Sequence, residues 1–204
     1  MCINLQRDGD ILNLVLDAPG KSANLLDREF TSRFSEVLGE IDKEKSFKGI
    51  LVRSAKKDFL AGAGLTMMLE AQKPDEVMEW LTEFKDGLRK LETLGKPVVA
   101  LIEGSALGGG YEVALTCHHR ISLDSSSIRI GCPEVNFGLI PGAGGTQRLP
   151  RIIGIQAALP ILVEGKTFRP SDALKAGLID EVASSGEEME KLAMHFIESN
   201  PESA

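Results

Sequence analysis

The sequence has no hydrophobic run that approaches the roughly 20 residues needed to cross a membrane. Its first residues, MCINLQRDGD, include an acidic pair where a secretory signal peptide would need a basic segment and then an apolar one. We therefore expect no membrane span and a cytoplasmic location. An organellar protein without its transit peptide would have the same sequence features.

Clustered basic residues are also missing. The formal net charge is -7, and Lys56-Lys57 is the densest basic pair near any candidate site. Binding to a nucleic-acid backbone needs clustered Lys and Arg, so we expect no nucleic-acid partner. An anionic small molecule stays open, because backbone N–H groups can bind a charge that the overall balance repels.

Cysteine is scarce, with Cys2, Cys117 and Cys132 as the three copies. An odd number without close pairing argues against a disulfide framework. The run Cys117-His118-His119 suggests a metal site at first sight. Adjacent residues of a helix point in different directions, however, so the three cannot all face one ion. We predict no metal.

Alternating apolar patterns dominate the rest of the chain. The length of 204 residues suits one substantial domain, which we expect to span 1–204. Strands are predicted at 11–17, 47–54, 97–103, 120–124 and 128–131, and helices at 27–41, 75–94, 110–118, 154–163, 171–176 and 187–198. Residues 133–145 are expected to form a loop. This alternation indicates an α/β fold with mostly parallel sheets flanked by helices.

Common glycine-rich nucleotide motifs fail when their spacing is checked. Gly165-Lys166-Thr167 has the ending of a P-loop, but Pro160 stands where its first glycine belongs. Gly142-Ala143-Gly144 begins a dinucleotide fingerprint, and Gln147 fails its third position. The nucleophile elbow G-x-S-x-G is absent.

The stretch GSALGGGYEVAL at 104–115 places glycines where a predicted strand ends and a helix begins. The first N–H groups of a helix lack intrahelical partners and carry partial positive charge, and glycine lets a ligand approach them. Gly109 is therefore a candidate donor to an oxyanion. The loop FLAGAG at 59–64 also follows a strand, and Ala63 could supply a second donor.

Two glutamates could complete such a site. Glu112 lies nearly one helical turn after Gly109, and Glu134 follows Pro133 in a loop that also contains Gly138. Two carboxylates near one water push their pKa values apart, so that one can donate a proton while the other accepts one. Taken singly, each glutamate also fits an ordinary surface role, and the glycines also fit a packing role.

Longer segments resemble one known family. ALGGGYEVAL at 106–115 and PEVNFGLIPGAGGTQRLPR at 133–151 are similar to the enoyl-CoA hydratase/isomerase family, the crotonase superfamily. The resemblance covers nearly the whole chain and implies the crotonase fold, with repeated ββα units and a truncated C-terminal helical part. It is greatest for the N-terminal hydratase domain of multifunctional β-oxidation enzymes, so we expect a fragment of a longer chain.

The resemblance also implies roles for individual residues. Glu112 and Glu134 match the catalytic carboxylates, Ala63 and Gly109 match the oxyanion donors, and Gly142 matches a glycine that holds the catalytic water. Residues that match the border of the coenzyme A site are Ala61, Gly62, Gly64 and Leu65. The family commonly has Asp where this chain has Gly64, which removes one side-chain contact expected toward coenzyme A.

The implied reaction is hydration of trans-2-enoyl-CoA to 3-hydroxyacyl-CoA in fatty-acid β-oxidation. It needs no metal or redox cofactor, and NAD would be required only if a 3-hydroxyacyl-CoA dehydrogenase part follows. Expected partners are an acyl-CoA substrate and either further copies of the chain or that dehydrogenase part. Isomerisation of 3-enoyl-CoA and non-catalytic acyl-CoA binding remain the alternatives, and the acyl chain length is left open.

Overall fold

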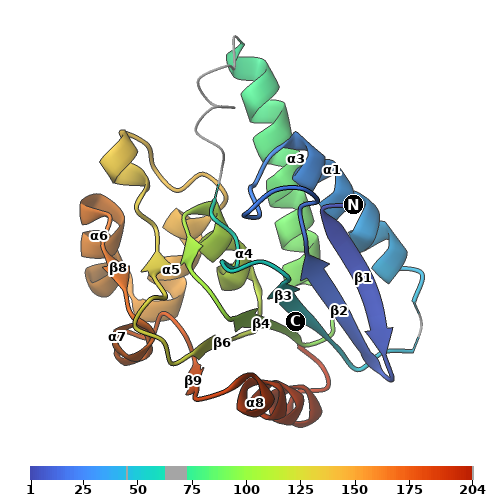
Figure 1. Ribbon diagram of the computed structural model, residues 1–204. Coiled ribbons are helices and arrows are strands. Elements are labelled where there is room, and N and C mark those ends of the chain that lie inside the picture. Colours follow the sequence, from blue (N-terminus) through green and yellow to red (C-terminus); the bar gives the residue numbers. More distant parts are fainter. Residues whose placement is uncertain (45, 63–72, 204) are drawn as a thin grey trace.

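Two sheets organise the computed structural model, which describes residues 1–44, 46–62 and 73–203 (Figure 1). The larger sheet has the strand order β1-β2-β3-β4-β6-β9. Its strands are β1 (Ile3–Asp8), β2 (Ile11–Leu16), β3 (Gly49–Ser54), β4 (Val98–Ile102), β6 (His119–Leu123) and β9 (Glu181–Ala183). Only the β1–β2 pair is antiparallel within it. The smaller sheet joins β5 (Ala106–Leu107), β7 (Ile130–Gly131) and β8 (Thr167–Phe168).

Helices cover both faces of the larger sheet. The helical segments are α1 (Arg28–Ile41), α3 (Pro74–Glu92), α4 (Gly109–Thr116), η1 (Glu134–Phe137), α5 (Gly145–Ile153), α6 (Ile155–Glu164), α7 (Pro170–Lys175) and α8 (Gly186–Ser199). Figure 1 shows α8 on one side of the sheet and α1, α3 and α4 on the other. Alternate β4 residues accordingly enter two hydrophobic clusters: Val98, Ala100 and Ile102 on the α1/α3 side, and Val99 and Leu101 on the α8 side. Burial on both faces explains the continuous apolar run of this strand.

The predicted alternation of parallel strands and helices is confirmed, as the example of α1 shows. Asp27 caps this helix by accepting a hydrogen bond from the Phe30 N–H at 2.9 Å. All the apolar side chains that define the predicted face are buried, namely Phe30, Phe34, Val37, Leu38 and Ile41. Four-residue and three-residue spacing therefore identified the inner face of the helix.

The prediction missed the short strands β5, β8 and β9 and two longer elements, β1 and α5. Strand β1 was missed because its sequence, INLQRD, is largely polar and it pairs only with β2 at the edge of the sheet. Helix α5 was also missed, since Pro150 lies inside it and the glycines before it suggested a continuing loop. Gly154, at φ 81°, separates α5 from α6, and η1 forms one short turn within the predicted loop.

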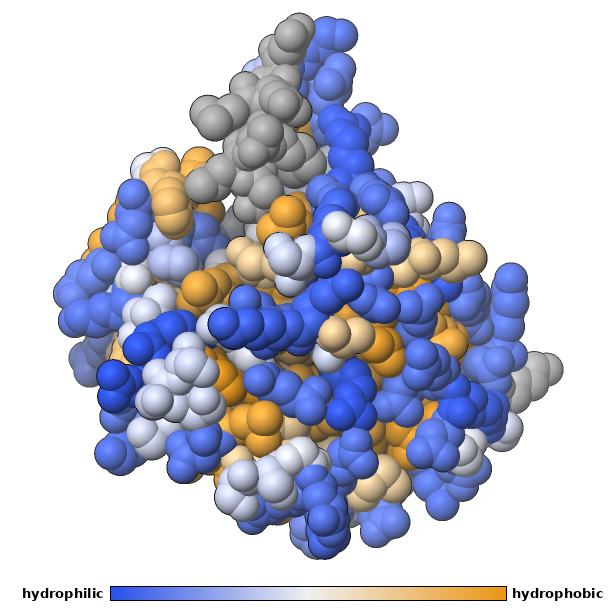
Figure 2. All heavy atoms as spheres, viewed as in Figure 1, coloured by the Kyte–Doolittle hydropathy of each residue, from blue (hydrophilic) through white to orange (hydrophobic). Residues whose placement is uncertain are grey.

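The predicted helix 110–118 is too long, because α4 ends at Thr116 and His119 already belongs to β6. The side chains of Cys117, His118 and His119 have separate surroundings. Cys117 is buried, His118 Nδ1 accepts from the Val98 N–H at 3.0 Å, and His119 Nε2 lies 2.7 Å from Glu181 Oε1. In the described parts of the chain, no helix is long and apolar enough to cross a membrane. The face seen in Figure 2 is mainly hydrophilic, with smaller apolar areas between the charged residues.

Candidate active site

Glu112 lies at the start of α4, where the glycine-rich stretch becomes helical. Gly108 is the N-cap at φ 55°, and the Glu112 N–H donates to the Gly108 carbonyl at 2.9 Å. The side chain is only 2% exposed, which separates it from an ordinary carboxylate in the first turn of a surface helix. Glu112 is thus a buried ionisable group, and such groups need hydrogen-bond partners.

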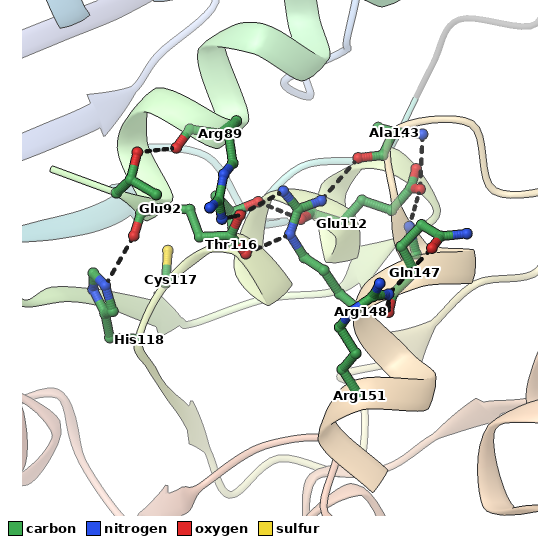
Figure 3. Close-up of polar contacts among 12 residues, drawn as sticks. Arg89, Glu92, Glu112, Thr116, Cys117, His118, Ala143, Gln147, Arg148 and Arg151 are labelled. Atoms are coloured by element: carbon green, nitrogen blue, oxygen red, sulfur yellow. Dashed lines mark hydrogen bonds and ion pairs between the residues drawn. The ribbon is translucent and has the colours of Figure 1, made fainter. Parts of the chain in front are cut away.

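The partners of Glu112 are backbone groups at the N-terminus of α5. Its Oε1 accepts hydrogen bonds from the Ala143 N–H at 2.8 Å and the Gly145 N–H at 2.7 Å (Figure 3). Burial raises the pKa of Glu112, while these two N–H donors and the charge of Arg148 act in the opposite direction. The start of a helix also favours a negative charge, so the donors partly offset the cost of burying the carboxylate.

Glu134 begins η1 and has a different environment. Its carboxylate lies against the same glycine turn, because a Cβ added to Gly108 would be 2.8 Å from Glu134 Oε1. Among the described residues, its buried Oε2 has no hydrogen-bond partner. Burial raises the pKa of Glu134 to about 7, opposed by its own backbone N–H and assisted by the negative charge of Glu112. A carboxyl with this pKa can both hold and release a proton near neutral pH.

The backbone around Gly109 is approached closely by the loop after β3. Leu60 forms an isolated parallel bridge with Ala106, and a Cβ added to Gly62 would lie 3.4 Å from the Gly109 nitrogen. Gly62 has φ 85°, a conformation that side chains disfavour. The chain therefore reaches residue 62 beside the Gly109 N–H. The predicted second donor, Ala63, lies outside the described residues, as do Gly64 and Leu65.

Other predicted positions fall around the same turn. Gly142 is exposed and lies in the loop before α5, where an added Cβ would be 3.8 Å from the Leu81 side chain of α3. Ala61 donates its N–H to the Asn24 carbonyl at 3.0 Å, and the Gly62 carbonyl accepts from the Leu26 N–H at 2.9 Å. These bonds attach residues 61 and 62 to the loop before α1.

Sequence reasoning missed the ion pair that supports this arrangement. Arg148 on α5 contacts Glu92 at the end of α3, with a distance of 3.0 Å from Nε to Oε1 (Figure 3). The two residues are 56 positions apart in the sequence, so no local pattern links them. Arg148 does lie within the segment 133–151 that carries the family resemblance, and that was the available signal.

A separate cavity of about 780 Å³ is formed by β1, β2, β3 and α8. Its charged lining includes Arg7, Lys48, Arg53 and Glu190, and it contains none of the predicted site residues. The described residues also contain no group of three or more His, Cys, Asp or Glu side chains arranged to hold a metal. We therefore take the two glutamates beside the glycine turn, and not this cavity, as the candidate active site.

Two carboxyl groups of unequal environment near one helix start are an arrangement suited to acid–base chemistry. The family model for enoyl-CoA hydratase/isomerase matches residues 6–203. The chain belongs to the enoyl-CoA hydratase/isomerase family. This confirms the family, the enzyme class and the crotonase-type fold that the motifs predicted.

Curated relatives and solved structures agree with this assignment. The chain is 43% identical over 178 residues to a fatty acid oxidation complex subunit alpha from Shewanella sp. (strain ANA-3), covering 87% of this chain. It spans about a quarter of the length of that relative (25%). Enoyl-CoA hydratase structures from Thermoplasma volcanium and Bacillus anthracis give TM-scores of 0.89 and 0.87 at 27% and 29% identity. They match 97% and 98% of this chain, over 78% and 76% of their own lengths.

Proposed function

We propose that the protein hydrates a trans-2-enoyl-CoA thioester to the 3-hydroxyacyl-CoA. The observation that carries this proposal is the unequal pair of glutamates at one glycine turn. Burial raises the pKa of both glutamates, that of Glu134 to about 7, but Glu112 also receives two backbone donors that favour its ionised form. One group is suited to act on water and the other to deliver a proton.

In the proposed step, water adds across the conjugated double bond. Glu112 accepts a proton from water as the water oxygen bonds to the β-carbon. The π electrons move toward the thioester, whose oxygen gains the negative charge of an enolate. Protonated Glu134 then donates its proton to the α-carbon, and proton exchange with solvent restores both carboxyl groups. One water is consumed, and no electrons enter or leave.

Backbone groups would stabilise the enolate oxygen. In this proposal the Gly109 N–H, at the first position of α4, is one donor, and the Ala63 N–H is the second. The close approach of Gly62 to the Gly109 nitrogen supports a donor from the next residue of that loop. Loss of one such donor typically raises the barrier by about 3–4 kcal/mol.

Binding roles follow from the same turn. The Gly142 N–H would help to hold the attacking water, because this exposed glycine precedes the two donors that bind Glu112. Residues Ala61, Gly62, Gly64 and Leu65 would border the coenzyme A group. The substrate is thus a coenzyme A thioester, and this domain would use no other cofactor.

The curated relatives suggest a larger context. Their name, fatty acid oxidation complex subunit alpha, and their greater length support placing this chain as the hydratase portion of a multifunctional β-oxidation enzyme. In that arrangement NAD would serve a dehydrogenase portion outside the 204 residues, and that portion or further copies of the chain would be the partners.

The test measures hydration of crotonyl-CoA by the purified protein and by Glu112→Gln and Glu134→Gln. Each substitution removes one acid–base group but keeps a side chain of similar shape. We therefore expect each hydration rate to fall about 10²–10⁴-fold. Calorimetry with a non-reactive acyl-CoA provides the control, since binding should persist. Wild-type rates in both variants would contradict the proposal.

Two other outcomes have distinct signatures in this assay. Acyl-CoA binding by the wild-type protein without any turnover would favour a binding module. Conversion of 3-enoyl-CoA to 2-enoyl-CoA that depends on one glutamate alone would indicate the isomerase, because a proton shuttle needs a single carboxyl group.

A further inference from the structure

Arg148 connects the end of α3 with the loop before α5. Its Nε and Nη2 lie 3.0 Å and 3.2 Å from Glu92 Oε1 and Oε2, and its Nη1 donates to the Ala143 carbonyl at 3.1 Å (Figure 3). The Arg148 side chain is 14% exposed and that of Glu92 is 27% exposed. A two-pronged pair of this kind has defined geometry, unlike most surface ion pairs.

The backbone of the loop before α5 lies close to the Arg148 guanidinium. Gly144 has φ 111°, a conformation that side chains rarely adopt, and an added Cβ would displace Arg148 Nη1. The residues on either side of Gly144 are Ala143 and Gly145, whose N–H groups bind Glu112. Arg148 therefore holds one side of a peptide segment whose other side holds the candidate base.

Glu92 is itself fixed at the end of α3. Its Oε2 also pairs with Arg89 at 2.9 Å, and its backbone carbonyl lies 3.2 Å from His118 Nε2. Since His118 Nδ1 accepts from the Val98 N–H, the proton of the neutral ring is on Nε2 and is directed to Glu92. Burial opposes the ionisation of Glu92, but the hydrogen bonds from Arg148 and Arg89 outweigh it and lower its pKa.

From these contacts we propose that Arg148, held by Glu92, is a positioning residue that keeps the Ala143–Gly145 donors aimed at the Glu112 carboxylate. The consequence for catalysis rests on the proposed function of Glu112, whereas the effect on the Glu112 carboxylate does not. Loss of Arg148 would free the Ala143 carbonyl and loosen the segment. The carboxylate would then lose hydrogen bonds that favour its charged form.

Charged and titratable groups face Glu112 from several elements. Arg148 on α5 provides a positive charge that lowers the Glu112 pKa. Among the described residues, the other titratable groups that interact with it electrostatically are Glu134 on η1 and the thiol of Cys132, which follows β7. Arg148 carries the positive charge in this set. Without it, the remaining titratable groups are negative when ionised, and they disfavour ionisation of Glu112.

The experiment compares Arg148→Met with Arg148→Lys, using Arg151→Met as the matched control. Arg151 lies on the same helix, but its side chain donates hydrogen bonds to Gln147 within α5. The readouts are kcat and KM with crotonyl-CoA, the melting temperature, and the 13C NMR titration of Glu112, assigned with Glu112→Gln.

For Arg148→Met we expect kcat to fall about 10–100-fold with KM changed by less than about threefold, since misplacement of a catalytic group affects the chemical step. The Glu112 pKa should rise by about one unit relative to the wild type. Arg148→Lys should recover part of both effects, because it keeps the charge but not the planar fork. The Arg151→Met control should match the wild type.

An unchanged Glu112 titration in folded Arg148→Met would overturn the proposal, even if the melting temperature fell. If Arg148→Met does not fold, Arg148→Lys and Glu92→Gln decide in the same way, through the titration. Absence of hydration by the wild-type protein would instead contradict the proposed function, and the NMR titration would still test the positioning role.

Discussion

The two glutamates lie in regions of very different construction. Around Glu112, α4 and α5 enclose a side chain that is 2% exposed and bound by two backbone N–H groups. Around Glu134, η1 and the loop that follows it carry exposed apolar residues, with Phe137 at 59% and Ile140 at 76%. The first region is closely packed, and the second turns much of its surface outward.

This difference explains how one residue type can serve two purposes. Burial raises the pKa of both glutamates, but only Glu112 receives compensating donors from a helix N-terminus. Glu134 instead has a buried oxygen that no described residue supplies with a hydrogen bond, which favours its neutral form. The environment, and not the amino acid, thus separates the proposed base from the proposed acid.

The largest expected effect comes from adding a methyl group at Gly110, in the packed region around Glu112. In Gly110→Ala the new Cβ would collide with the Leu60 carbonyl, which neither backbone can avoid. We expect loss of soluble, cooperatively folded protein, measured by expression yield and thermal unfolding. The matched control is Gly39→Ala in α1, where nothing lies within 4 Å and the exchange should stabilise the helix by up to about 1 kcal/mol.

The same substitution in the η1 region sharpens the comparison. Gly138 has open space around its Cβ position but a φ of 71°. Gly138→Ala should therefore cost only about 1 kcal/mol of backbone strain and leave a folded protein. Equal damage from Gly110→Ala and Gly138→Ala would contradict the contrast between the regions.

An intermediate effect is expected when the Glu112 side chain is removed. Glu112→Ala leaves the Ala143 and Gly145 N–H groups buried without their acceptor, and each such group costs about 1–3 kcal/mol. We expect a fall of about 2–4 kcal/mol in the free energy of unfolding, measured with urea at pH 7. Glu112→Gln keeps an acceptor oxygen and should lose less. Equal stability of the two variants would show that the donors find other partners.

The smallest effect is a gain in stability, and it concerns Glu134. Its pKa is about 7 in the folded protein and about 4.5 when unfolded, so the folded state binds more protons between these values. Stability therefore decreases as pH rises through this window. Glu134→Gln cannot ionise and should be more stable than the wild type above pH 7, by about 1 kcal/mol after allowing for partial exposure.

Chemical denaturation from pH 5 to pH 8 measures this difference. The wild-type curve should decline relative to Glu134→Gln, and the two should converge at the acidic end. Parallel curves would mean that Glu134 is not held in its neutral form.

Sequence patterns predicted much of this molecule because its signals are local. Buried strands such as β4 appear as apolar runs, and the face of α1 follows from residue spacing. The glycines before α4 and in its first turn mark a crossing so close that Gly104 and Gly110 have no room for a side chain. Such positions leave a mark on the sequence because every substitution there meets backbone atoms.

What could not be predicted depends on distant contacts. The burial of Glu112 is decided by a loop 31 to 33 residues further along, so its position alone also fitted a surface carboxylate. Strand β1 is recognisable only through its pairing with β2. Helix α5 forms despite Pro150, since packing against α4 and α6 outweighs local propensity.

The hydrogen bonds of Glu112 also bear on the order of events during synthesis. When Glu112 leaves the ribosome, Ala143 and Gly145, which follow it by 31 and 33 residues, have not yet emerged. Until they arrive, packing α4 inward would bury a carboxylate without partners, which is unfavourable. Until then, we expect the Glu112 carboxylate on this helix to stay in contact with water. The final packing of α4 and the formation of the candidate active site therefore depend on the same contacts between distant segments. Such contacts form late in folding.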